Sequence, residues 1–174
     1  MVLSNEDIKS AIRRGILRFE PALSPEQIGS ASVDLTLAGD FWVFKKKYVN
    51  SKKAVDLSKV DFREATEEHK EKSITLPPGG MCLGITKEKI YMPSDLMGTL
   101  EGRSRFARMG LAVHVTSALV QPGSQNHQVL EIVNFAPFPV TIREGMRISQ
   151  IVFEKLDSRT SKPYAQFGKI AKKQ

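Results

Sequence analysis

Arginines and a serine gather in one short segment of the chain, residues 101–110. Arg103, Arg105 and Arg108 lie close together, Ser104 stands among them, and a glycine flanks the group on each side. Backbone N–H groups in a glycine-flanked turn can approach an anion closely, and guanidinium groups add bidentate contacts to phosphate. The segment therefore predicts a triphosphate-binding turn, with a solvated helical turn as the alternative. It is not a Walker loop, because the glycine–lysine spacing of that motif is absent.

One carboxylate, Glu131, lies within a run of aliphatic residues. The period of a strand puts Val129, Glu131 and Val133 on one face and Leu130 and Ile132 on the other. Both faces are apolar, so we expect a strand that is buried on both sides with Glu131 inside. A buried carboxylate must be paired, hydrogen-bonded or protonated. Two interpretations stay open, an ion pair with a nearby arginine or a general acid/base.

Hydrogen-bonding side chains also follow one another where a predicted strand runs into a Pro-Gly turn. Thr116, Ser117 and Gln121 are placed to bind a nucleobase or a sugar, whereas His114 has the simpler interpretation of a satisfied histidine on a strand. No group of histidines and carboxylates has the spacing of metal ligands. The one cysteine, Cys82, excludes an internal disulfide and the H-x-E with P-C-x-x-C signature of zinc deaminases.

Composition limits the classes of protein that the chain can belong to. Its 174 residues are 41% hydrophobic, which is enough for one packed domain, and the net charge of +7 favours polyanionic partners. The basic runs lack interleaved aromatic residues, so we expect nucleotide phosphates rather than nucleic acid as the partner. No apolar run approaches the roughly 20 residues that span a bilayer, and residues 1–10 lack the apolar core of a signal peptide. We therefore expect a cytoplasmic protein without a membrane partner.

The elements that must position these residues are mostly short strands. A helix is expected to begin after Ser4, with Asp7 completing a capping box, and to stop near Gly15. Strand-like segments cover residues 32–37, 40–44, 81–86, 90–92, 97–101, 112–116, 128–134, 140–142 and 147–156. The polar residues 45–73 read as a surface excursion with at most a strand or a loose turn. This pattern predicts an all-β barrel or jelly roll over residues 1–156, followed by a basic, flexible C-terminal arm over 157–174.

Taken together, the motifs resemble the dCTP deaminase family. The matching residues, in the order and close to the spacing of that family, are Gly102-Arg103-Ser104, Ala107-Arg108-Met109-Gly110-Leu111, His114-Val115-Thr116, Pro122-Gly123, Val129-Leu130-Glu131, Asn134, Gly145-Met146 and Phe153-Glu154. The resemblance implies a homotrimer of distorted β-barrel subunits, a fold shared with trimeric dUTPases. It also implies hydrolytic deamination of dCTP to dUTP and ammonia, which supplies dUTP for dUMP and dTTP synthesis. Mg²⁺ would accompany the triphosphate without a protein-bound catalytic metal, and dTTP would act as a feedback inhibitor.

The resemblance assigns roles to single residues as well. Glu131 matches the catalytic glutamate, and Ser104 and Arg108 match residues that position the water. The full set of candidate substrate-binding residues is Arg103, Arg105, Phe106, Ala107, Thr116, Ser117, Gln121, Val129, Leu130, Tyr164, Lys169 and Gln174. The last two match only when a short deletion in the tail is allowed.

The chain departs from the family pattern at several of these positions. Arg105 replaces a second serine, and Ser117 stands where a small alanine is usual. Gln121 replaces an aspartate, and Ser124-Gln125-Asn126 replaces an aromatic-x-glycine. In the related dUTPases the equivalent aspartate activates the attacking water, so Gln121 argues against pyrophosphate hydrolysis. The alternatives to dCTP deamination are a dUTP diphosphatase, a bifunctional deaminase and dUTPase, and a non-catalytic nucleotide-binding homologue.

Overall fold

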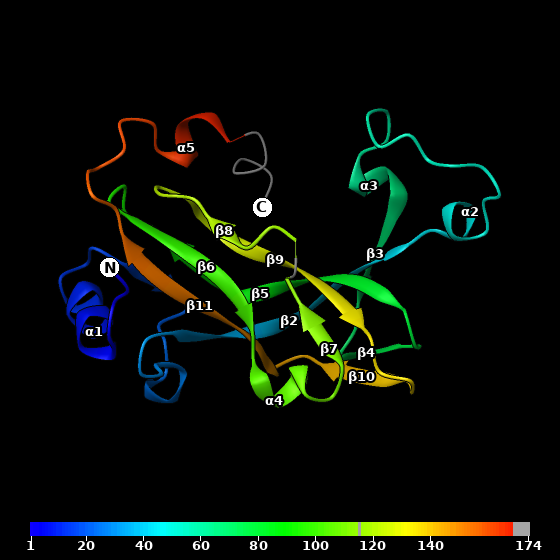
Figure 1. Ribbon diagram of the computed structural model, residues 1–174, viewed down its shortest axis with the longest axis horizontal. Helices are drawn as coiled ribbons and strands as arrows, with labels where there is room; N and C mark the ends of the chain where they lie inside the picture. The colour runs from blue at the N-terminus through cyan, green and yellow to red at the C-terminus, as the bar shows by residue number, and fades with distance from the viewer. Residues whose placement is uncertain (115, 169–174) are drawn as a thin grey trace.

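The computed structural model describes residues 1–114 and 116–168, and most of its β-strands lie in one curled sheet (Figure 1). The strands are β1 (Arg18–Glu20), β2 (Val33–Phe44), β3 (Thr66–Lys70), β4 (Ser73–Leu76), β5 (Met81–Tyr91), β6 (Leu96–Gly102), β7 (Leu111–Val113), β8 (Leu119–Val120), β9 (Gln125–Asn134), β10 (Val140–Arg143) and β11 (Arg147–Lys155). Nine of them make the sheet, in the order β7-β9-β5-β2-β11-β6-β8 with β1 against β5 and β3 against β2. Strands β10 and β4 form a separate pair.

Irregular pairing bends this sheet into a half-barrel. The register shifts between Leu37 and Phe41 on β2, between Ile85 and Lys89 on β5, and at the start of β11. Each such irregularity bends its strand and increases the local twist. The concave side holds the core, whose largest fully buried side chains include Phe41 and Phe153. The expectation of a fold built mainly from β-strands is confirmed, although the sheet is a curled half-barrel rather than the closed barrel or jelly roll that the sequence predicted. The two segments predicted at 81–86 and 90–92 are one irregular strand.

The N-terminal helix α1 (Asn5–Arg13) begins where the sequence predicted. The Ser4 side chain accepts a hydrogen bond from the Asp7 backbone N–H, and the Asp7 carboxylate accepts one from Ser4 N–H in return. Ile8 on its inner face is fully buried. Gly15 follows the helix with φ of +67°, a left-handed conformation that favours glycine. No helix in the described part of the chain is long and apolar enough to cross a membrane.

Short helical turns make up the rest of the helical structure. They are η1 (Pro25–Gln27), α2 (Lys46–Val49), α3 (Phe62–Ala65), α4 (Ser104–Ala107) and α5 (Tyr164–Phe167). The polar segment 45–73 therefore contains two helical turns as well as a strand. Its strand β3 pairs with β2, so the end of the segment is part of the sheet rather than a solvated loop.

The described part of the C-terminal arm, residues 157–168, lies against the domain, although the sequence predicted a flexible arm. Thr160 N–H donates to the Ser94 carbonyl at 2.9 Å, and Tyr164 N–H donates to the Pro122 carbonyl at 2.9 Å. At Gly123 a Cβ atom would lie 2.5 Å from Pro163 Cβ, so only glycine leaves room for the arm there. Residues 169–174, which include the candidates Lys169 and Gln174, lie outside the described part of the chain.

Candidate active site

Glu131 lies on the outer face of β9, where it is only half-buried. Leu130 and Ile132 point into the half-barrel and are fully buried, whereas Val129, Glu131 and Val133 are each half-buried. The prediction that both faces of this strand are buried is therefore wrong for the single chain. The side chain of Leu130 belongs to the core, so only its backbone is placed to meet a ligand.

Thr116 orients the Glu131 carboxylate. Its hydroxyl donates a short hydrogen bond to Glu131 Oε2, and its backbone N–H lies 3.3 Å from the same oxygen. The partner of this carboxylate is thus a threonine rather than the arginine that the ion-pair interpretation required. Because both contacts fall on Oε2, the other oxygen, Oε1, keeps its capacity to accept a proton.

A turn at His114 exposes the edge of β9 next to Glu131. His114 has φ of +59°, which is uncommon for a residue other than glycine and turns the chain away after β7. The ladder between β7 and β9 ends at the pair of Val113 and Ile132, and His114 N–H donates to the Glu131 carbonyl at 2.7 Å. Alternate residues of a strand direct their backbone groups to the same side. The N–H and C=O of Val129 therefore point to the same side as the Glu131 carbonyl, past the end of the ladder.

A polar cavity of about 240 Å³ opens at this edge. The residues that line it are Leu100, His114, Ser117, Leu119, Val120, Gln121, Ser124, Asn126, Gln128, Val129 and Tyr164. Four of them, Ser117, Gln121, Val129 and Tyr164, are among the sequence-predicted binding residues. Sequence reasoning missed Asn126 and Gln128 as wall residues. The alternation of side chains could have identified them. It places Asn126 and Gln128 on the same inner face of β9 as Leu130 and Ile132, so the first half of that face is polar.

The arginine-rich turn is anchored by a partly buried aspartate, Asp34. Arg103 stands at the N-cap of α4, and its guanidinium lies 2.9 Å from Asp34 Oδ2 on β2. Arg103 also donates to the Arg147 carbonyl at 2.8 Å, and the Arg147 guanidinium lies 3.9 Å from the same aspartate. Burial raises the pKa of the Asp34 carboxyl, and the charges of Arg103 and Arg147 lower it by less. Arg103 thus has a structural role, because it connects the turn to Asp34 on β2 and to the backbone of Arg147. The resemblance did not indicate this role.

The remaining residues of the turn lie outside the polar cavity, and all but Phe106 face solvent. Ser104, Arg105, Ala107 and Arg108 are exposed, while Phe106 packs against the core and lies beneath the Arg105 guanidinium. None of them lines the cavity. In Figure 1, α4 lies at the lower edge of the molecule and α5 at the upper edge. One chain therefore does not bring the two groups of predicted site residues together.

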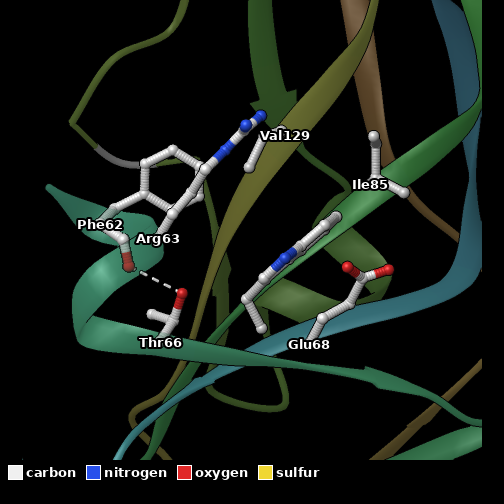
Figure 2. A pocket seen from close by; sticks show the side chains of 7 residues that line it. Phe62, Arg63, Thr66, Glu68, Ile85 and Val129 are labelled. Atoms are coloured by element: carbon white, nitrogen blue, oxygen red, sulfur yellow. Dashed lines mark hydrogen bonds between the residues drawn. The ribbon is translucent and has the colours of Figure 1, made fainter. Parts of the chain in front are cut away.

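A second cavity, of about 400 Å³, lies on the outer face of the sheet, with Val129 in its wall (Figure 2). The other residues that line it are Trp42, Phe62, Arg63, Thr66, Glu68 and Ile85. In Figure 2 the Arg63 side chain extends from α3 toward Val129, and Thr66 donates a hydrogen bond to the Phe62 carbonyl at 2.8 Å. The segment interpreted as solvated thus builds a wall beside the strand that carries Glu131. The runs of charged residues in segment 45–73 favoured the interpretation as a solvated loop, so the sequence did not indicate this role.

Within the described residues, no three His, Cys, Asp or Glu side chains are grouped so that they could hold a metal ion. Glu131 is the carboxylate that stands next to the open strand edge.

Known proteins resemble this chain over most of its length. A dCTP deaminase of Rhodospirillum rubrum is 40% identical over 172 residues, which cover 95% of this chain and 88% of that protein. A protein of Methanosphaera stadtmanae named dCTP deaminase, dUMP-forming, is 34% identical and covers 98% and 87% respectively.

A solved structure of the same kind supports the fold. The 2′-deoxycytidine 5′-triphosphate deaminase from Agrobacterium tumefaciens superimposes with a TM-score of 0.68 at 21% identity. The match covers 88% of this chain but only 47% of that one, so the present chain spans about half of its length. The family model described as dCTP deaminase-like matches residues 2–156. The chain therefore belongs to the dCTP deaminase-like family.

Proposed function

We propose that the protein hydrolyses dCTP to dUTP and ammonia, and so supplies dUTP for the synthesis of dUMP and dTTP. The observation that carries the proposal is the position of Glu131, an oriented carboxylate beside an open strand edge that leads into a polar cavity. The names of the relatives agree with this reaction. A cytoplasmic location and feedback inhibition by dTTP stay predictions from the sequence.

The open edge at Val129 suits the cytosine ring. A backbone N–H donates to the ring nitrogen N3 or the carbonyl O2, and the neighbouring C=O accepts from the 4-amino group. Bound in this way, the base presents C4 to the Glu131 side chain two residues further along β9. The sugar then lies on the opposite side, toward Ser117, Gln121 and Tyr164, which line the cavity.

Glu131 then acts as the general base and the general acid. Its Oε1 accepts a proton from water as the water oxygen bonds to C4, and Thr116 holds Oε2 in place. The carboxylic acid passes this proton to N3, and the carboxylate then takes the second proton from the new hydroxyl on C4 and delivers it to the amino group. The C4–N4 bond breaks as the C4 carbonyl forms, and ammonia leaves. A positioned proton transfer of this kind typically accelerates a reaction by about 10²–10⁴-fold.

We infer that the active site is completed in a homotrimer by α4 of a neighbouring subunit. Within one chain, the α4 residues lie away from the cavity, and the apolar side chains around Glu131 on the outer face, Leu83, Val129 and Val133, are left half-buried. In the trimer, Ser104 and Arg108 of the neighbour would orient the water. Arg105 and the tail residues Lys169 and Gln174 would bind the triphosphate, with Mg²⁺ arriving as part of the nucleotide.

The formation of dUMP is the second candidate activity, because three relatives carry the words dUMP-forming in their names, at 34%, 38% and 32% identity. Such an enzyme also hydrolyses the α–β phosphoanhydride bond and releases pyrophosphate. Gln121 favours the simple deaminase, since an amide cannot take a proton from water as an aspartate does. A nucleotide-binding homologue without turnover would release neither product.

The decisive test compares single and mixed variants at Glu131 and Arg108. Glu131→Gln keeps the shape of the side chain but cannot take a proton from water, so we expect dCTP binding with at least about 100-fold less ammonia release. Arg108→Ala should also be inactive. Refolding equal amounts of the two variants together should restore about a quarter of the native activity if each site draws on two subunits in random mixtures. Near-native turnover of a folded Glu131→Gln protein would refute the mechanism, and mixtures without any recovery would refute the shared site.

A further inference from the structure

The polar cavity beside Val129 contains two buried polar groups without partners in the described chain. Ser124 is 2% exposed and His114 is 8% exposed. Among residues 1–114 and 116–168, neither Ser124 Oγ nor His114 Nδ1 has a hydrogen-bond partner, and both residues line the cavity. Buried polar groups are normally hydrogen-bonded, so two such groups in one cavity indicate a ligand that supplies the missing bonds.

The chemistry of the two groups matches hydroxyls. His114 Nε2 lies 2.6 Å from the Ser117 carbonyl oxygen, which can only accept a hydrogen bond. Nε2 therefore carries the proton, and Nδ1 of the neutral ring is an acceptor. The Ser124 hydroxyl can donate or accept. One ligand hydroxyl that donates to Nδ1 and a second that pairs with Ser124 would satisfy both groups.

The position of the cavity identifies which part of a nucleotide enters it. Its volume of about 240 Å³ lies below the roughly 300–1,000 Å³ of a typical small-molecule site, so it accommodates one part of a nucleotide. Two residues of a strand span about 6.8 Å. A cytosine whose C4 lies beside Glu131 therefore places its sugar beyond Val129, toward the start of β9 at Gln125 and the adjacent Ser124.

We propose that this cavity accepts a ribose and that the protein deaminates CTP as well as dCTP. A ribose offers two neighbouring hydroxyls for Ser124 and His114, whereas a deoxyribose offers one. A sugar that displaces solvent from a polar group without replacing its hydrogen bond loses affinity. The reaction is CTP plus water to UTP plus ammonia: the water oxygen bonds to C4, Glu131 transfers one water proton to N3 and the other to the amino group, and the C4–N4 bond breaks. This inference rests on the proposed deamination and extends its substrate class.

Steady-state deamination of CTP and dCTP by the native protein and two Ser124 variants tests the proposal. We expect the kcat/KM values of the native protein for the two nucleotides to lie within about tenfold of each other. Ser124→Ala removes the hydroxyl and should lower kcat/KM for CTP by about two- to twelvefold, the range of one net hydrogen bond, with a smaller change for dCTP. Ser124→Phe fills the cavity and should reject CTP by about 100-fold or more relative to dCTP. The exposed Ser30→Ala is the matched control.

The outcomes distinguish a failure of the ribose proposal from a failure of the proposed deamination. Turnover of dCTP together with CTP turnover poorer by more than about a thousandfold overturns the proposal and leaves the proposed function standing. Equal losses for both nucleotides in Ser124→Ala also overturn it. If neither nucleotide is deaminated, the proposed function fails, and calorimetry on the native protein decides the ribose site. CTP binding as tight as dCTP binding and weakened by Ser124→Ala supports it, and weaker CTP binding overturns it.

Discussion

Replacing either partner of the Asp34–Arg103 ion pair should have unequal effects on stability. The Asp34 side chain is 13% exposed and the Arg103 side chain 30% exposed. In Asp34→Asn the guanidinium that remains is partly solvated and keeps its bond to the Arg147 carbonyl. In Arg103→Gln the carboxylate that remains is nearly dehydrated, and its other cation, Arg147, lies 3.9 Å away. The loss of Arg103 should therefore cost more.

The magnitudes follow from the burial of each group. Removing one partner of a fully buried pair costs about 3–5 kcal/mol, and the partial exposure of Arg103 reduces this to about 2 kcal/mol for Arg103→Gln. For a domain of this size that loss corresponds to a drop in Tm of about 4–8 °C. Asp34→Asn removes a charge that burial disfavours, so its cost should stay within about 1 kcal/mol at neutral pH.

The pH dependence has a definite sign. Because the pKa of Asp34 is higher in the folded protein than its ordinary value, its titration adds stability at low pH, and that stability is lost as the pH rises through the folded pKa. Native protein should therefore gain free energy of unfolding relative to Asp34→Asn as the pH falls from neutral toward the ordinary pKa of an aspartate.

Urea unfolding of both variants at a fixed protomer concentration, at neutral and mildly acidic pH, measures these differences. The matched control is the exposed pair of Asp40 and Lys70, at 3.3 Å, where replacing either partner should cost less than about 1 kcal/mol. A loss in Asp34→Asn as large as in Arg103→Gln would refute the reasoning. A fall in the stability of the native protein relative to Asp34→Asn on acidification would refute it too.

Three further predictions concern the site and the assembly. Thr116→Val, which loses the hydroxyl bond to Glu131 but keeps the backbone N–H, should lower kcat about tenfold, and Thr116→Ser should restore it; an unchanged rate in the valine variant would contradict the orienting role. The native protein should release little pyrophosphate from dUTP and Gln121→Asp more, which a phosphate-coupled assay measures; rapid release by the native protein would show dUMP formation. Light scattering should give about three times 19.4 kDa, and an active monomer would exclude the shared site.

Local signals predicted the strands and the first helix well. The segment expected at 147–156 is β11 over Arg147–Lys155, and the capping box of Ser4 and Asp7 forms as expected. Both depend on neighbours in sequence, namely the alternation of side chains and the reach of a carboxylate across one helical turn. The short strand β8, with two residues, is below the length at which alternation can be recognised.

The parts of the site that could not be predicted depend on distant contacts. Alternation showed which residues share a face with Glu131, but it carries no information on whether another layer covers that face. The left-handed conformation occurs at His114 rather than at a glycine. The local sequence therefore does not indicate that the pairing of β7 with β9 ends there. Asp34 and Arg103 are far apart in sequence, and their pairing arises only from the closure of the sheet around β2, β11 and β6.

The contact of the C-terminal arm with the Pro122-Gly123 turn affects when the polar cavity can form during synthesis of the chain. Tyr164 lines the polar cavity and is held by the Pro122 carbonyl, so one wall of the cavity comes from a segment that a ribosome makes after every strand of the sheet. A nascent chain that has completed β11 can fold its half-barrel while that wall is still missing. Nucleotide binding therefore reports on complete synthesis, and a proteolytic cut between residues 156 and 163 should leave the β-sheet circular dichroism intact while it weakens nucleotide binding.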